Sequence, residues 1–216
     1  MLRDERIPDE VEKLKDDLIW VWHYFMQFKK LFGKSSLRVE LLNEVAPLFF
    51  YTLQRLLWFE IIMGIGRLTD PHRQGPHRNL SIAILPKLAE WYQWQFAEEL
   101  QERVSTAINT AEPVRAWRKK LVAHRDLPTA LHNAKRLEPI DVEQIEQMLS
   151  VLGEAIDEVY LGLTEAVWNW LPIASQDADA LVHFLKMGMI YRDKIKQTRD
   201  WQEEQKDWND LKYKDA

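Results

Sequence analysis

Residues 112–126 read EPVRAWRKKLVAHRD. This stretch contains most of the side chains that could carry chemistry. A proline in the first turn is a helix start signal, so Pro113 predicts a helix that begins here and ends before Pro128. On a helical wheel the apolar side chains lie on one side. They are those of Val114, Trp117, Leu121 and Val122. The stretch therefore predicts an amphipathic helix at the centre of the molecule.

Two arginines interrupt this pattern. Arg118 and Arg125 fall inside the apolar side of the wheel, and His124 lies at its edge. A desolvated guanidinium without a partner costs several kcal/mol, so each arginine must be paired, hydrogen-bonded or used in function.

Glu60 is one possible partner for Arg118, because it is the only acid in the apolar segment 56–66. The alternative is that Glu60 pairs with Arg55 or Arg67, or faces solvent. Gly64 and Gly66 in the same segment predict the close approach of another backbone.

Length and composition predict one helical domain. The chain has 216 residues, seven glycines, nine prolines and no cysteine, and spacings of three and four residues dominate its apolar pattern. We expect an all-α bundle of about five to six helices with long central helices. The bundle is expected to span residues 1–195, followed by a polar helical extension or tail at 196–216.

The sequence predicts a cytoplasmic protein that does not contact a membrane. The charged opening lacks an apolar secretion segment. The most apolar region, residues 45–66, is interrupted by Arg55 and Glu60.

Charge is unevenly distributed along the chain. The formal net charge is −5, whereas residues 112–136 carry four arginines and three lysines against two acids, a net charge of +5. A local basic surface of this kind is compatible with phosphate binding, and a solvated helix face without a partner is the alternative.

The remaining helices are predicted from caps and apolar spacing. We expect helices at residues 8–32, 37–69, 82–109 and 142–170, and a last one that opens at Ser175 or Asp177. Ser36 is the expected cap of the second, and Asp141 with Gln144 forms a capping box for the fourth. Pro47 is expected to kink the second helix.

The segment DPHRQGPHRNLS, residues 70–81, is predicted to be a turn-rich loop in which Ser81 caps the next helix. It carries the basic side chains His72, Arg73, His77 and Arg78. In front of a helix N-terminus these side chains favour an anion. Their spacing matches no zinc pattern, so neither a metal nor another cofactor is expected.

Three segments resemble the AbiU-type, abortive-infection branch of the HEPN superfamily. They are RLTDPHRQGPHRNLS at 67–81, RAWRKKLVAHRD at 115–126 and DADALVHFLKMG at 177–188, and the resemblance covers roughly residues 10 to 190. HEPN proteins are helical bundles, commonly dimers, and many are metal-independent ribonucleases that serve as toxins or antiviral effectors. Their motif is an arginine, four to six residues, and then a histidine.

By this resemblance, Arg118 and His124 are the catalytic pair. Lys119 stands where the family often has asparagine, which keeps a positive charge but removes an amide. The expected supporting and RNA-binding residues are Lys119, Lys120, Arg115, Arg125, Asp126 and Glu60.

The implied chemistry is cleavage of RNA by its own 2′-hydroxyl. His124 would move the proton and Arg118 would hold the phosphate oxygens. The two residues are six positions apart, so one straight helix does not aim both at one atom, and a twofold dimer would supply two histidines.

The expected partners are RNA, a second copy of the chain and a cognate antitoxin protein. The alternative is a catalytically inactive binding or interaction module on the same fold, in which Arg118 forms a structural ion pair.

Overall fold

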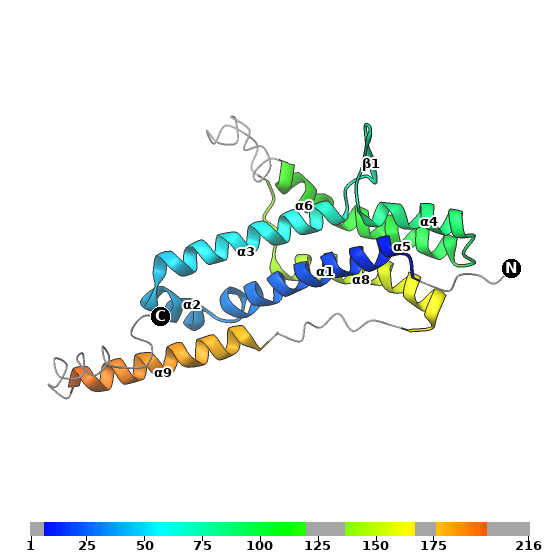
Figure 1. The fold of residues 1–216 in the computed structure, drawn as a ribbon. Helices are drawn as coiled ribbons and strands as arrows, with labels where there is room; N and C mark the ends of the chain where they lie inside the picture. Colours follow the sequence, from blue (N-terminus) through cyan, green and yellow to red (C-terminus); the bar gives the residue numbers. More distant parts are fainter. Residues whose placement is uncertain (1–6, 120–136, 167–175, 198–216) are drawn as a thin grey trace.

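The computed structural model describes residues 7–119, 137–166 and 176–197 (Figure 1). This part of the chain forms eight α-helices and one short hairpin, which confirms the all-α class. The helices are α1 (Asp9–Phe28), α2 (Ser36–Val45), α3 (Pro47–Leu68), α4 (Leu85–Tyr92), α5 (Ala97–Thr110), α6 (Glu112–Trp117), α8 (Val142–Thr164) and α9 (Asp177–Gln197). A π-helical turn, η1 (Lys29–Gly33), extends α1, and a 3-10 turn, η2 (Ile82–Ile84), leads into α4. The hairpin joins β1 (Arg73–Gln74) to β2 (His77–Arg78).

The core lies around α1, which packs between α3 and α8, while α5 covers α8 (Figure 1). Side chains spaced by three and four residues on these helices meet in the centre, as the sequence predicts. Fully buried members of this core are Leu14, Leu18, Phe25, Ile61, Ile65, Leu100, Leu149 and Ile156.

The predicted second helix is in fact two helices. Pro47 does not kink one long helix; it starts α3, and Ala46 before it is extended, with φ −156° and ψ 75°. The residue before a proline is driven out of the helical region by a clash with the proline ring, which accounts for the break. The cap of α2 is Ser35 rather than Ser36, and its side chain accepts a hydrogen bond from the backbone N–H of Arg38.

The predicted helix at residues 82–109 is also interrupted. It breaks at Gln93, whose φ of 55° is left-handed and ends α4. The rings of Tyr92, Trp94 and Phe96 then stack in sequence, with centroid distances of 5.7 and 5.3 Å. Ser81 occupies the cap position of η2, but its side chain makes no capping hydrogen bond.

The other three predicted helices are present. Residues 8–32 form α1 and η1, the helix predicted at 142–170 is α8, and the last helix is α9. The predicted end of α8 is wrong, because the helix stops at Thr164 and Glu165 is left-handed, with φ 57°. Asp141 and Gln144 form the capping box at the start of α8, and α9 begins at Asp177. The α9 helix packs against α2 and η1 through a second small apolar cluster and then extends away from the bundle (Figure 1).

The α3 helix carries apolar side chains on two sides. Among the described residues it is the one helix long and apolar enough to cross a membrane by length and composition, a test that the central helix of a bundle also passes. One side is buried against α1. The other side, which we call the outer face of α3, is a stripe spaced by three and four residues, Phe49, Thr52, Leu56, Phe59 and Met63. Phe49 and Leu56 are 61% and 58% exposed, so this stripe has no partner within the described part of the chain.

Candidate functional site

The helix that carries Arg118 starts as the sequence predicts. The α6 helix begins at Glu112 with Pro113 in its first turn, and Val114 is fully buried. Trp117 packs on the core, and its Nε1 donates a hydrogen bond of 2.7 Å to the carbonyl oxygen of Glu138. The chain then widens into a π-helical turn at Arg118 and Lys119, a geometry that is frequent at functional sites.

Arg118 forms an ion pair with Asp70. Its Nη1 donates to both carboxylate oxygens at 2.7 Å, and the two side chains are 24% and 25% exposed. Of the two possibilities for Glu60, pairing with Arg118 is therefore the one that the structure rejects. Asp70 follows the end of α3, and α3 packs against α6, so its carboxylate lies against the guanidinium.

The side chain of Arg118 lies directly on the backbone of Gly66. A Cβ atom at Gly66 would lie 2.4 Å from Cδ of Arg118 and 3.2 Å from its Nη1, so only glycine leaves room for this side chain. The sequence predicts close approach of another backbone at Gly64 and Gly66. The structure instead places side chains there, Val21 at Gly64 and Arg118 at Gly66.

Arg115 joins the same elements one turn earlier. It forms an ion pair with Glu112, and its Nη1 donates to the carbonyl oxygen of Thr69 at 3.3 Å. Thr69 is itself buried, and its hydroxyl donates to the carbonyl oxygen of Ile65. The end of α3, the root of the hairpin and α6 are therefore held together as one corner of the molecule.

This corner leaves part of the guanidinium of Arg118 available. Within the described residues, only Nη1 is hydrogen-bonded, and Nε and Nη2 have no partner. A guanidinium that is oriented by one carboxylate can still offer its other donors to a phosphate. Lys119 beside it is exposed.

The other predicted site residues are distributed as follows. His124, Lys120, Arg125 and Asp126 lie outside the described residues. Glu60 is half-buried on α3 and forms no ion pair with a described residue. The predicted anion-binding loop is the β1–β2 hairpin, with Arg73, His77 and Arg78 exposed and His72 half-buried. The described residues contain no group of three side chains suited to hold a metal ion.

Sequence reasoning missed Asp70 and the role of Gly66. Asp70 is 48 residues from Arg118, and no local pattern links an acid in a turn with an arginine so far along the chain. The sequence predicts that another backbone approaches Gly66, but the group in this space is the side chain of Arg118, which tertiary packing places there.

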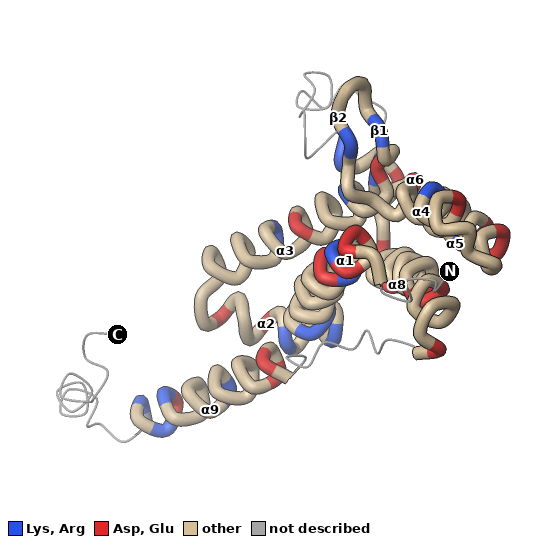
Figure 2. The backbone as a smooth tube through the Cα atoms, turned by 45° about the vertical axis from the view of Figure 1, so that its right-hand side comes forward, with Lys and Arg blue, Asp and Glu red and all other residues tan. Residues whose placement is uncertain are grey.

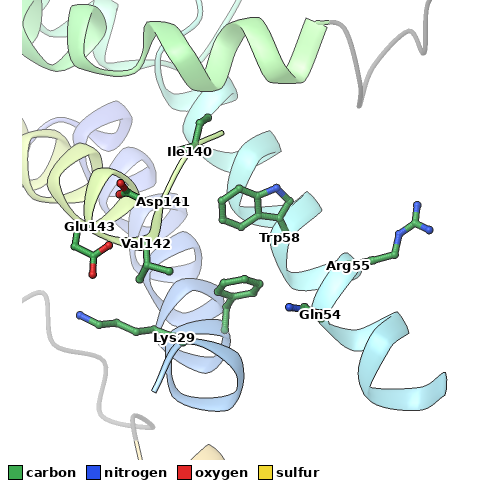
Figure 3. A pocket seen from close by; sticks show the side chains of 10 residues that line it. Lys29, Gln54, Arg55, Trp58, Ile140, Asp141, Val142 and Glu143 are labelled. Atoms are coloured by element: carbon green, nitrogen blue, oxygen red, sulfur yellow. The ribbon is translucent and has the colours of Figure 1, made fainter. Parts of the chain in front are cut away.

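A separate groove of about 650 Å³ lies between α3 and the start of α8. Phe28 and Trp58 form its aromatic wall, with ring centroids 5.3 Å apart. Figure 3 shows Trp58 reaching toward Ile140 and Val142, while Arg55 points away from the groove. Lys29 at the edge is paired with Glu146 at 2.7 Å. The groove contains none of the predicted catalytic residues.

Comparison with known proteins gives one match. A family model described as AbiU2 (HEPN_AbiU2) matches residues 4–184. No curated protein matches the chain, and no solved structure does.

Proposed function

Because the chain belongs to the AbiU2 family of HEPN proteins, we propose that it is a metal-independent endoribonuclease of an abortive-infection or toxin type system. In this proposal Arg118 binds the phosphate that is cleaved, and His124 is the general acid and base. The protein acts in the cytoplasm, and a cognate antitoxin protein restrains it.

The observation that supports the proposal is the orientation of the Arg118 guanidinium. The guanidinium is oriented by Asp70 and lies in the space that Gly66 leaves open, and two of its nitrogens have no partner among the residues that the structure describes. Such an arrangement supports transition-state stabilisation, because donors that are already oriented need no reorganisation when charge develops on the phosphate. A purely structural arginine would be expected to use more of its donors within the protein.

The chemistry needs no group beyond RNA and the protein. The 2′-hydroxyl attacks the adjacent phosphorus, the 5′-oxygen of the next nucleotide leaves, and a 2′,3′-cyclic phosphate forms. The histidine of one copy accepts the hydroxyl proton, and the protonated histidine of a second copy gives a proton to the leaving oxygen. Arg118 stabilises the charge on the non-bridging oxygens.

We further propose that two copies pair along the outer face of α3. Written as a heptad, Phe49, Leu56 and Met63 take the a position, Thr52 and Phe59 the d position, Arg55 the g position and Glu60 the e position. In two parallel helices g faces e of the partner, so Arg55 of one copy meets Glu60 of the other. A parallel pair also brings both Arg118 side chains to the same end of the dimer, where two histidines can serve one reaction.

Cleavage of a structured RNA by the full chain tests the nuclease proposal. We expect cleavage that a chelator does not reduce and that His124→Ala lowers by at least about 100-fold. Arg118→Lys keeps the charge but loses the two-pronged contact, so it should also be strongly impaired. His183→Ala removes an exposed histidine on α9 and should have no effect. An inactive wild-type protein, or equal cleavage after His124→Ala, ends the proposal.

The alternative is a binding or interaction module without catalysis, and the Arg118–Asp70 ion pair favours it. In that case Arg118→Ala and Asp70→Asn should both lower the melting temperature by several degrees, because each leaves one charge or donor group without its partner. An unchanged melting curve together with lost RNA affinity contradicts this alternative.

A further inference from the structure

The β1–β2 hairpin is a defined finger that projects from the bundle (Figures 1 and 2). Its strands pair Arg73 with Arg78 and Gln74 with His77. Gly75, with φ +62°, allows the tight turn between them. At the root, the backbone N–H of Asn79 donates to the carbonyl oxygen of His72 at 2.8 Å, which closes the finger.

The pairing places two positive charges side by side. Residues directly opposite each other in a ladder point to the same face, so Arg73 and Arg78 are neighbours. Like charges in this position destabilise a hairpin. No described residue forms an ion pair with either arginine, and the sequence contains no acid between Asp70 and Glu90. Both side chains are exposed, so solvent screens part of this repulsion, and an anion between them would relieve the rest.

The finger is attached to the proposed catalytic corner. It begins directly after Asp70, whose carboxylate holds Arg118, and Thr69 before it accepts a hydrogen bond from Arg115. The root of the finger is therefore next to Arg118. Residues 73–78 are all exposed and line none of the described pockets, so they present no enclosed site for a small anion.

The composition of the finger favours contacts with phosphates over contacts with bases. No phenylalanine, tyrosine or tryptophan lies between Asp70 and Glu90, so the finger offers no platform on which bases could stack. Arginines without such a platform contact phosphates and position a nucleic acid without reading its sequence. A rigid pair of charges is best matched by phosphates that are already ordered in a double helix, because less entropy is lost on binding.

We propose that the hairpin binds the phosphate backbone of a double-helical stem in the RNA substrate. The RNA segment next to this stem reaches Arg118. This inference rests on the proposed nuclease function, since it assumes that RNA is the ligand of the corner. It adds the substrate class, which is a stem-containing RNA recognised by its backbone.

RNA binding by the full chain tests the proposal for the hairpin. The chain carries His124→Ala, so that cleavage does not disturb the measurement. Fluorescence anisotropy is followed with a labelled stem-loop RNA and with an unstructured strand of equal length, between 50 and 200 mM salt. Adding Arg73→Ala and Arg78→Ala should weaken stem-loop binding roughly tenfold or more and reduce the salt slope by about two. The unstructured strand should lose much less.

Two matched variants complete the experiment. Lys186→Ala with Lys194→Ala removes the same charge from exposed positions on α9 and should leave stem-loop affinity unchanged. Arg73→Lys with Arg78→Lys keeps the charge and should retain most of the affinity. Circular dichroism checks that each variant remains folded.

The possible results distinguish the proposal for the hairpin from the proposal of nuclease activity. Unchanged affinity and salt slope after removal of both arginines overturns the hairpin proposal, even if the wild type cleaves RNA. Equal weakening for the unstructured strand overturns the assignment to a stem. A wild type that binds the stem-loop through both arginines but never cleaves it supports the hairpin and ends the nuclease proposal. Absence of RNA binding by the wild type overturns both.

Discussion

At the scale of single residues, the position of Arg118 depends on a missing side chain. Its Cδ occupies the space that a Cβ of residue 66 would fill, at 2.4 Å. Gly66→Ala should therefore push the guanidinium away from Asp70. A displacement of about 1 Å at a catalytic group can cost about 100-fold in rate, so we expect RNA cleavage to fall by that order. The measurement is the cleavage rate at saturating protein.

Stability should respond differently from activity in this variant. Alanine is favoured over glycine within a helix by about 0.5–1 kcal/mol, which offsets part of the local clash. We therefore expect a small change in melting temperature. Gly188→Ala is the matched control, because a Cβ there meets nothing within 4 Å. If Gly66→Ala cleaves RNA as fast as the control, Arg118 does not need its observed position.

The sequence predicts that Arg118 must have a partner but not which one. The helical wheel shows that a charge lies among apolar groups, and this follows from local periodicity alone. The choice of Asp70 over Glu60 depends on how the chain turns after α3, which no local pattern encodes.

At the scale of elements, the carboxylate of Asp179 links α9 to the bundle, beside the apolar cluster and the ion pair of Arg192 with Glu44. Asp179 accepts hydrogen bonds of 2.8 Å from Lys30 of η1 and from Arg38 of α2. These bonds hold the pKa of Asp179 well below its ordinary value. Because the folded pKa is lowered, the stabilisation is present above the unfolded pKa of about 3.9 and is lost as the pH falls below it.

Asp179→Asn should loosen α9 at neutral pH while the bundle remains folded. Hydrogen exchange of the amides of Asp177–Gln197 measures this, and their protection should decrease. In the wild type the same loss should appear only when the pH falls below about 4. Asp193→Asn on the exposed side of α9 is the control. Equal protection in Asp179→Asn and Asp193→Asn would show that the apolar cluster and the Arg192–Glu44 ion pair hold the helix without Asp179.

The sequence predicts helices well where a capping residue or an apolar stripe marks them. It predicts the breaks between helices less well. The capping box of Asp141 and Gln144 fixes the start of α8 in sequence and structure alike. The sequence predicts a kink at Pro47, but the steric restriction on Ala46 divides the helix there into α2 and α3. The left-handed Gln93 has no signal of its own, since glutamine rarely adopts this conformation.

At the scale of the whole molecule, the outer face of α3 is apolar and flanked by opposite charges. Phe49, Leu56 and Phe59 are 61%, 58% and 42% exposed. Contiguous apolar surface of this kind marks an interaction site. In the proposed dimer a second copy covers this face, and Arg55 then meets Glu60 of the other parallel α3 helix. A membrane would instead leave both charges without partners.

Leu56→Glu should convert the dimer into a monomer, because it places two carboxylates against each other at the centre of the pair. Light scattering in detergent-free solution measures the mass. Leu161→Glu, a similar change at an exposed residue of α8, should remain a dimer. A wild type that is monomeric at all concentrations, or that binds neutral lipid vesicles through α3, overturns the second copy as the occupant.

Charge reversal tests the parallel register itself. Arg55→Glu and Glu60→Arg should each raise the dissociation constant of the dimer roughly tenfold, because each places like charges together at both symmetric contacts. The double variant restores opposite charges at every contact and should recover the affinity of the wild type. In an antiparallel pair g faces g and e faces e, so the two residues would not meet and the double variant would show no recovery. Recovery would therefore place both Arg118 side chains at one end of the dimer, which is the arrangement that a shared site requires.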